Sequence, residues 1–278
     1  MQGASRESLA TLREQLSDLT DGSSAAQLQQ LSDELFAVVT LLTSEGALRR
    51  TLSDPAIDQS AKERFVDSLF GDRLSAPALR LLQQLARARW SEPRDVVDAV
   101  EHLAVETALV RAESDGQLDE VEDALFRFER ILAAEPPLRA ALTDRMLPAE
   151  RKRELMNRLL EGKVAEVTLG LIERAVLAPR GRTIERVLRE FSELAATRRE
   201  RLIARVTSAV PLTEEQQEQL AESLRTATGR DIRLQLLVDP ELVGGLTVRI
   251  GDEQIDGSVA RHLAEARRRL TGGSGSRF

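Results

Sequence analysis

The chain has 278 residues, of which 42% are hydrophobic and 31% charged, a composition that suits two or three folded domains and excludes a disordered chain. It contains no cysteine, which excludes disulfide bonds and thiolate chemistry. The net charge of −7 comes from 39 basic and 46 acidic residues that are interleaved along the chain, so no nucleic-acid partner is expected.

The first hundred or so residues have apolar positions at the spacing of amphipathic helices. Helices are predicted near 5–20, 25–43, 45–53, 60–70, 76–90 and 93–113. A Ser60-x-x-Glu63 capping box is predicted to open the fourth helix, and Pro77 and Pro93 fall where a first-turn proline is tolerated. We interpret Trp90, the single tryptophan, as the edge of a core rather than as an anchor for a partner.

The same helical pattern then occurs a second time. The segment 48–54 matches 138–144 at an offset of 90, and apolar positions keep this register over about seventy residues. The last helix of the first copy is predicted to run into the first helix of the second, with a break at Asp115-Gly116. The fifth helix of each copy is apolar almost all round, which predicts a place at the centre of a bundle or in an interface.

After about residue 205 the apolar period changes from that of a helix to that of a strand. Strands are predicted at 204–210, 232–238 and 246–250, with a helix opened by the capping box Thr213-x-x-Gln216 and a last helix from 256–258 to Leu270. The predicted fold is therefore mainly α, with two tandem six-helix bundles over 1–104 and 105–205 and a small α+β domain over 206–278. The Gly- and Ser-rich tail from about 271 is expected to be disordered.

No arrangement of residues predicts chemistry, so no catalytic, cofactor or metal site is expected. His102 and His262 lie in different predicted domains, and neither has further ligands at metal-binding spacing. The glycines at 244, 245 and 251 lack the strand–loop–helix context of a phosphate loop, and they are interpreted as turn residues.

Two stretches, 206–216 and 238–259, closely resemble the delta subunit family of F-type ATP synthases, whose mitochondrial relative is the oligomycin-sensitivity-conferring protein. The family signature is Asp-Pro, an apolar pair, Gly-Gly, an alternating strand, Gly-Asp and Ile-Asp-Gly-Ser, and every part is present in order. Residues 105–278 resemble one complete delta subunit. The extra copy before them resembles the actinobacterial form, in which the helical domain is duplicated.

The resemblance implies a non-catalytic stator subunit on the cytoplasmic face of the bacterial plasma membrane, attached to the membrane only through the complex. In the family, the helical domain holds N-terminal helices of the α subunits between its first and fifth helices, and the C-terminal domain grips the b-type peripheral stalk. The β subunit is a further candidate partner. These contacts keep the catalytic head from rotating during proton-driven ATP synthesis.

Carried onto this chain, the resemblance implies three sets of residues. The helix-binding grooves would use Leu109, Val110, Leu169, Leu171 and Ile172 in the second copy and Leu9, Leu12, Leu16, Leu79, Leu81 and Leu82 in the first. The stalk contact would use Leu242, Val243 and Leu246. The positions that define the C-terminal fold would be Asp239, Pro240, Gly244, Gly245, Gly251, Asp256, Gly257 and Ser258. For each groove residue, plain core packing is an equal alternative.

Two other functions are open to such a sequence. A free-standing helical scaffold or chaperone would also bind partner helices, but it gives no reason for the C-terminal signature. A small enzyme is disfavoured because no nucleophile, base or cofactor loop converges.

Overall fold

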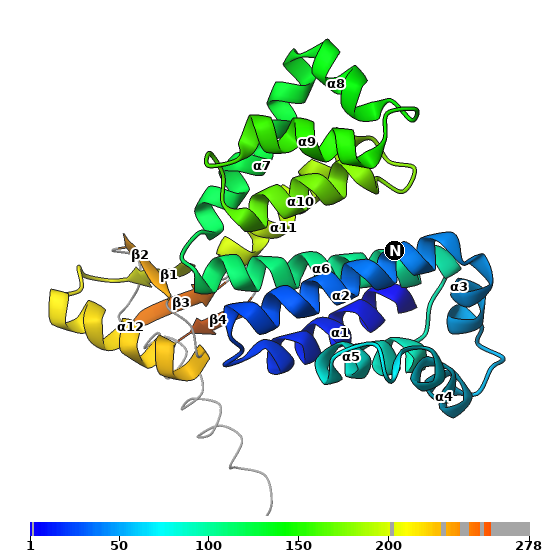
Figure 1. Cartoon of the computed structure of the whole chain (residues 1–278). Coiled ribbons are helices and arrows are strands. Elements are labelled where there is room, and N and C mark those ends of the chain that lie inside the picture. Colours follow the sequence, from blue (N-terminus) through cyan, green and yellow to red (C-terminus); the bar gives the residue numbers. More distant parts are fainter. Residues whose placement is uncertain (2, 201–202, 229–231, 240–244, 251–252, 257–278) are drawn as a thin grey trace, which may run out of the picture. The chain divides into compact units, whose positions relative to one another are not determined.

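The computed structural model describes residues 1, 3–200, 203–228, 232–239, 245–250 and 253–256 (Figure 1). The chain divides after Ala195 into two compact units. The first unit is helical, and the second holds a small sheet with one described helix.

The first copy of the repeat consists of the six helices that the sequence predicts. They are α1 (Ala4–Thr20), α2 (Ala25–Ser44), α3 (Gly46–Ser53), α4 (Gln59–Phe70), α5 (Ala76–Arg87) and α6 (Pro93–Ser114). The most extensive helix pair is α2 with α6, whose Val96, Val100 and Leu103 are buried. Burial of such side chains contributes about 1.5–3 kcal/mol each, and it is the main force that holds the copy together.

The helix starts show one prediction that is wrong. Helix α4 is capped by Asp58, whose carboxylate accepts hydrogen bonds from the backbone N–H groups of Ser60 and Ala61, so Ser60 lies inside the first turn. The helix starts at Gln59, before the predicted box, and the Asp58 carboxylate takes the capping position there. A full capping box occurs instead at α2, between Ser24 and Gln27.

The second copy continues with α7 (Leu118–Ala134), α8 (Pro136–Thr143), α9 (Ala149–Leu160), α10 (Glu166–Leu177) and α11 (Ile184–Glu200). The repeat extends to single hydrogen bonds. Asp54 follows α3 and accepts from the N–H of Ala56, and Asp144 follows α8 and accepts from the N–H of Met146. Because the same side chain closes the same turn in both copies, the sequence match reflects a structural repeat.

Helix α6, the long teal helix of Figure 1, continues without interruption across residues 104 and 105, where the first two predicted domains meet. It contacts α1, α2 and α3 of the first copy and α7 and α10 of the second. It ends at Ser114 with Asp115 as its C-cap, and Gly116 follows with a φ of 68°, a backbone conformation that favours glycine. The predicted break at Asp115-Gly116 is therefore confirmed.

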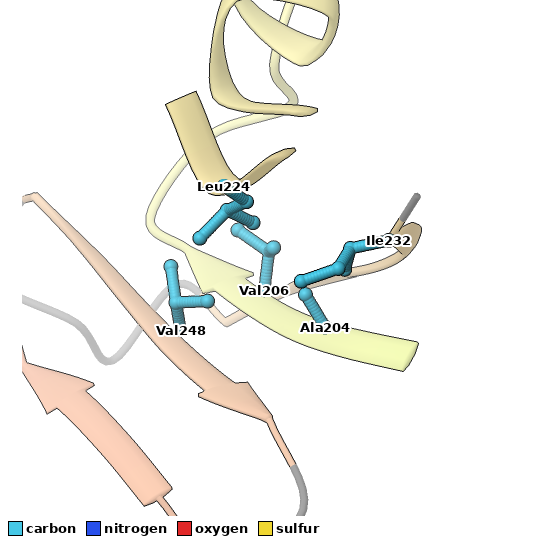
Figure 2. Packing of buried hydrophobic residues seen from close by; sticks show 5 residues of the cluster. All are labelled: Ala204, Val206, Leu224, Ile232 and Val248. Carbon is cyan, nitrogen blue, oxygen red and sulfur yellow. The ribbon is translucent and has the colours of Figure 1, made fainter. Parts of the chain in front are cut away.

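The second unit contains β1 (Ile203–Ser208), α12 (Glu214–Thr228), β2 (Arg233–Val238), β3 (Leu246–Ile250) and β4 (Glu253–Asp256). The strand order is β2-β1-β3-β4, in which β1 and β2 are parallel and the other pairs antiparallel. Figure 2 shows its core, where Leu224 of α12 packs on side chains from the sheet and its flanks. The members are Ala204, Val206, Leu224, Ile232 and Val248.

Two details of this unit differ from the prediction. The first strand ends at Ser208 rather than at residue 210. The strand β4 was not predicted, and Asp256, expected to cap a last helix, is its final residue and pairs with Thr247. The segment 253–256 has a single apolar residue, so its pairing with β3 leaves no signal in the alternation. The predicted last helix and tail lie outside the described residues.

The capping box of α12 is confirmed. The N–H of Thr213 donates to Gln216 Oε1 at 3.0 Å, and the N–H of Gln216 donates to Thr213 Oγ1 at 3.3 Å.

In the described part of the chain, no helix combines the length and the apolar character that crossing a membrane requires.

Candidate functional site

The residues proposed for the two helix-binding grooves separate into two groups. Seven are at most 3% exposed and pack inside the bundle: Leu12, Leu16, Leu81, Leu82, Leu109, Leu171 and Ile172. The other four are half-buried: Leu9, Leu79, Val110 and Leu169. A fully buried side chain supports a groove from below, and only the half-buried group reaches the surface where a partner would lie.

Two members of the half-buried group occupy equivalent positions of the repeat. Leu79 of α5 and Leu169 of α10 are equivalent positions, and each lies on the fifth helix of its copy. Leu9 of α1 and Val110 of α6 lie on the helices predicted to open each copy. Each copy therefore has the apolar positions that a helix-binding groove requires.

A cleft of about 250 Å³ lies beside the groove of the second copy, between α2, α6 and α10. Its lining includes Leu169 and Leu171 from the predicted set, and Ser32, Phe36 and Val167, which the sequence did not suggest. At the offset of 90, Phe36 is equivalent to Phe126 of the second copy. Its role follows from packing between the copies, which the sequence pattern alone does not specify.

Two arginines bridge the walls of this cleft. Arg111 of α6 donates to Glu166 Oε2 of α10 at 2.6 Å and also to the side chain of Gln29 on α2. Arg174 of α10 donates to Asp33 Oδ1 of α2 at 3.2 Å, and its guanidinium lies 4.8 Å from the centre of the Phe36 ring. Such a position over an aromatic ring adds a cation–π attraction to the ion pair.

A second ionic network joins the copies at the loop between α10 and α11. Arg180, with a φ of 52°, donates to Glu101 Oε1 at 3.0 Å and to Asp98 Oδ1 at 2.8 Å. Arg182 donates to Glu101 Oε1 at 2.7 Å and to Glu190 Oε2 at 2.6 Å. The side chains of Arg180, Arg182 and Glu101 are only 7%, 10% and 9% exposed, so their charges depend on each other for compensation.

The pKa values in this network follow from the pairing. Burial acts to lower the pKa of Arg180, but hydrogen bonds and the charges of Glu101 and Asp98 outweigh it, and the pKa is raised. Burial acts to raise the pKa of Glu190, but hydrogen bonds from Arg186 and Arg182 outweigh it, and the pKa is lowered. Arg180 and Glu190 therefore keep their charges near neutral pH.

The remaining polar groups of interest support the fold. His102 Nε2 lies 3.7 Å from Glu106 Oε2, and Glu106 also accepts from Arg13 Nε at 2.8 and 2.9 Å. In the described part of the chain, no three acidic or histidine side chains are grouped to hold a metal ion, and His262 lies outside it. Trp90 is buried and donates from Nε1 to the Leu85 carbonyl at 2.9 Å, which confirms its place at the edge of the core.

In the second unit, Leu246 is half-buried at the start of β3. It lines a shallow groove beside α12, whose other walls are Leu212, Gln216, Gln219, Leu220 and Ser223. The other stalk candidates, Leu242 and Val243, lie outside the described residues, as do Pro240, Gly244, Gly251, Gly257 and Ser258.

Two signature positions have a defined backbone role. The N–H of Asp239 donates to the Ser208 carbonyl at 2.9 Å, which ties the end of β2 to that of β1. Gly245 has a φ of 82°, a conformation that favours glycine at the entry to β3.

Comparison with known proteins gives two results. The model of the family described as ATP synthase delta (OSCP) subunit matches this chain twice, over residues 18–110 and 106–270. The chain is also similar over nearly its whole length to proteins named ATP synthase subunit delta. The protein from Streptomyces avermitilis is 48% identical over 96% of this chain and 98% of its own length, and that from Thermobifida fusca is 47% identical over 98% and 100%. The protein from Acidothermus cellulolyticus is 46% identical over 97% and 99%.

Proposed function

The chain belongs to the ATP synthase delta (OSCP) family, and on that premise we propose that it is a non-catalytic stator subunit of an F-type ATP synthase. The observation that carries this proposal is the double match of the family model, whose second match covers both the second helical copy and the sheet unit. The chain would keep the catalytic head from turning with the rotor and so support proton-driven ATP synthesis.

The helical unit is the proposed contact with the head. Each copy is assigned six helices, with α6 closing the first copy and opening the second, and with a groove between the first and fifth helices. An amphipathic N-terminal helix of an α subunit would lay its apolar face against half-buried residues such as Leu79. A helix held in this way needs no catalytic group, only apolar area and slow dissociation.

The sheet unit is the proposed contact with the stalk. The shallow groove of Leu212, Leu220 and Leu246 offers apolar side chains, and Gln216 and Gln219 on its rim can donate and accept hydrogen bonds. Such an apolar floor with a polar rim suits the end of a b-type stalk helix.

These contacts would locate the chain on the cytoplasmic face of the plasma membrane, bound there only through the complex. The β subunit is a further candidate partner. The rival function, a free-standing helical scaffold, remains an outcome of the test below.

Co-purification of a tagged chain from native membranes separates the two functions. A stator subunit is expected to bring α, β and b-type subunits in fixed proportion, because all belong to one complex. Recovery of the folded chain with none of these subunits would reject the stator function in favour of the scaffold.

A matched pair of variants tests the stalk contact. Leu220→Asp puts a charge on the groove floor and is expected to lose the b-type subunit, since burying an unpaired carboxylate opposes binding. Glu218→Arg changes an exposed position on the same helix and should leave recovery unchanged. Equal recovery of the b-type subunit by both variants, with thermal unfolding unchanged, would remove the groove from the stalk contact.

A further inference from the structure

The grooves of the two copies differ in what borders them. In the second copy, the groove between α6 and α10 has α2 of the first copy as its third wall. Helix α2 packs along α6 more extensively than any other pair of described helices, and its Leu28, Leu31 and Leu35 are buried. The third wall is therefore part of the core rather than a movable lid.

The two arginines described above hold that wall against α10. Arg111 joins α6 to both α2 and α10, because it bonds Gln29 on one side and Glu166 on the other. Arg174 joins α10 to α2 through Asp33 and lies over Phe36. The cleft between these helices is only about 250 Å³. A helix entering this groove would therefore have to break both bridges.

The groove of the first copy has no such bridges at the equivalent positions. The residue equivalent to Arg174 is Gln84, and the residue equivalent to Glu166 is Ala76. Among the described helices, those that pack substantially on α1 and α5 are α2, α3, α4 and α6, all of the first copy. Leu9 and Leu79 keep part of their surface exposed there.

We propose that α2 and the two arginine bridges close the groove of the second copy, so that the chain binds a single amphipathic α-subunit helix, in the groove of the first copy. The second copy then provides no helix-binding site of its own. This inference rests on the proposed function, because it concerns the same helix-binding site.

Calorimetry of the full chain with a synthetic peptide of the α-subunit N-terminal helix tests the inference. We expect a stoichiometry of one. Leu79→Asp should abolish binding, and Leu169→Asp, its match in the second copy, should leave affinity unchanged within about twofold, because a distant site does not couple to the occupied one. Thermal unfolding of both variants checks that each is folded.

The absence of native cysteine allows a second readout that does not depend on affinity. Single thiols introduced by Leu79→Cys or Leu169→Cys are labelled with a maleimide, with and without peptide. The peptide is expected to protect the thiol of Leu79→Cys and to leave the labelling of Leu169→Cys unchanged.

The bridges themselves are tested in the Leu169→Cys background. Adding Arg111→Ala and Arg174→Ala is expected to speed labelling of that thiol roughly threefold or more, because two ion pairs that restrain α10 are lost. Arg151→Ala, which removes an exposed pair with Glu154, is the control and should change nothing. Labelling that does not respond to the double change would overturn the role given to the arginines.

The possible results separate the two proposals. A stoichiometry of two, or protection of the thiol of Leu169→Cys, would overturn this inference and leave the stator function standing. No binding of the peptide to the folded chain would overturn the helix-binding function itself, and this inference with it.

Discussion

At the scale of single residues, Glu101 is the shared acceptor of a buried ionic network. Its carboxylate accepts from both Arg180 and Arg182, and all three side chains are at most 10% exposed. Losing one partner of a buried ionic group costs more than the pair contributes, because the remaining charges stay buried without compensation.

Glu101→Ala is therefore expected to lower the free energy of unfolding by about 3–5 kcal/mol, as measured by urea denaturation. Glu154→Ala removes the carboxylate of an exposed pair with Arg151 and should cost less than about 1 kcal/mol. Equal effects of the two changes would contradict the role given to the buried network.

The lowered pKa of Glu190 predicts how the helical unit responds to acid. Its pKa in the folded state lies below the ordinary value of 4.5, so the stabilisation it provides is complete above that value and is lost as the pH falls through the folded pKa. Glu190→Gln should thus flatten the fall in stability on the acid side of pH 4.5 and leave its shape near neutral pH unchanged. Melting temperatures of both proteins as a function of pH measure this. An equal fall in melting temperature below pH 4.5 in the native chain and the variant would rule it out.

At the scale of elements, the cap of α4 distinguishes the structure from the sequence pattern. Asp58→Ala removes the acceptor for two backbone N–H groups and should destabilise the chain by about 1 kcal/mol in urea denaturation. Ser60→Ala should cost clearly less, because Ser60 is in the first turn. A larger loss of stability in Ser60→Ala than in Asp58→Ala would instead support the capping box that the sequence predicts.

The small core of the sheet unit is the other element-scale test. Leu224 is 6% exposed and connects α12 to the sheet, so Leu224→Ala should lower the stability of this unit by about 2–5 kcal/mol. Leu237 on β2 is 52% exposed, and Leu237→Ala should have little effect. Hydrogen exchange of the β1 and β3 amides follows this unit separately, and similar exchange in the two variants would mean that Leu224 does not hold it together.

The elements were largely predictable from the sequence because each helix buries one row of apolar residues. The same rows of apolar residues occur again in the second copy. The exceptions are local: β4 has too few apolar residues to show alternation, and the cap at Asp58 depends on which side chain reaches the free amides. For the candidate site, the pattern identified apolar residues on the correct helices. It could not separate Leu79 at the surface from Leu81 in the core, since both continue an apolar run.

At the scale of the whole molecule, a duplicated sequence has produced two copies that differ in their surroundings. Phe36 is buried beneath Arg174 of the second copy, whereas Phe126, its repeat equivalent on α7, is 50% exposed. The contact between the copies therefore covers the face of α2 that carries Phe36 and leaves the equivalent face of α7 exposed. Neither this contact nor its arginine bridges could be predicted from helical periodicity, which specifies faces but not the neighbours they meet.

We propose that this chain joins the head of the synthase to its stalk. The most direct test immobilises the soluble part of the b-type subunit and measures retention of the α–β head with and without the full chain. The head should be retained only when the chain is present, and Leu79→Asp should abolish retention. Retention of the head without the chain, or its loss despite a chain that is folded and bound to the stalk, would contradict the claim.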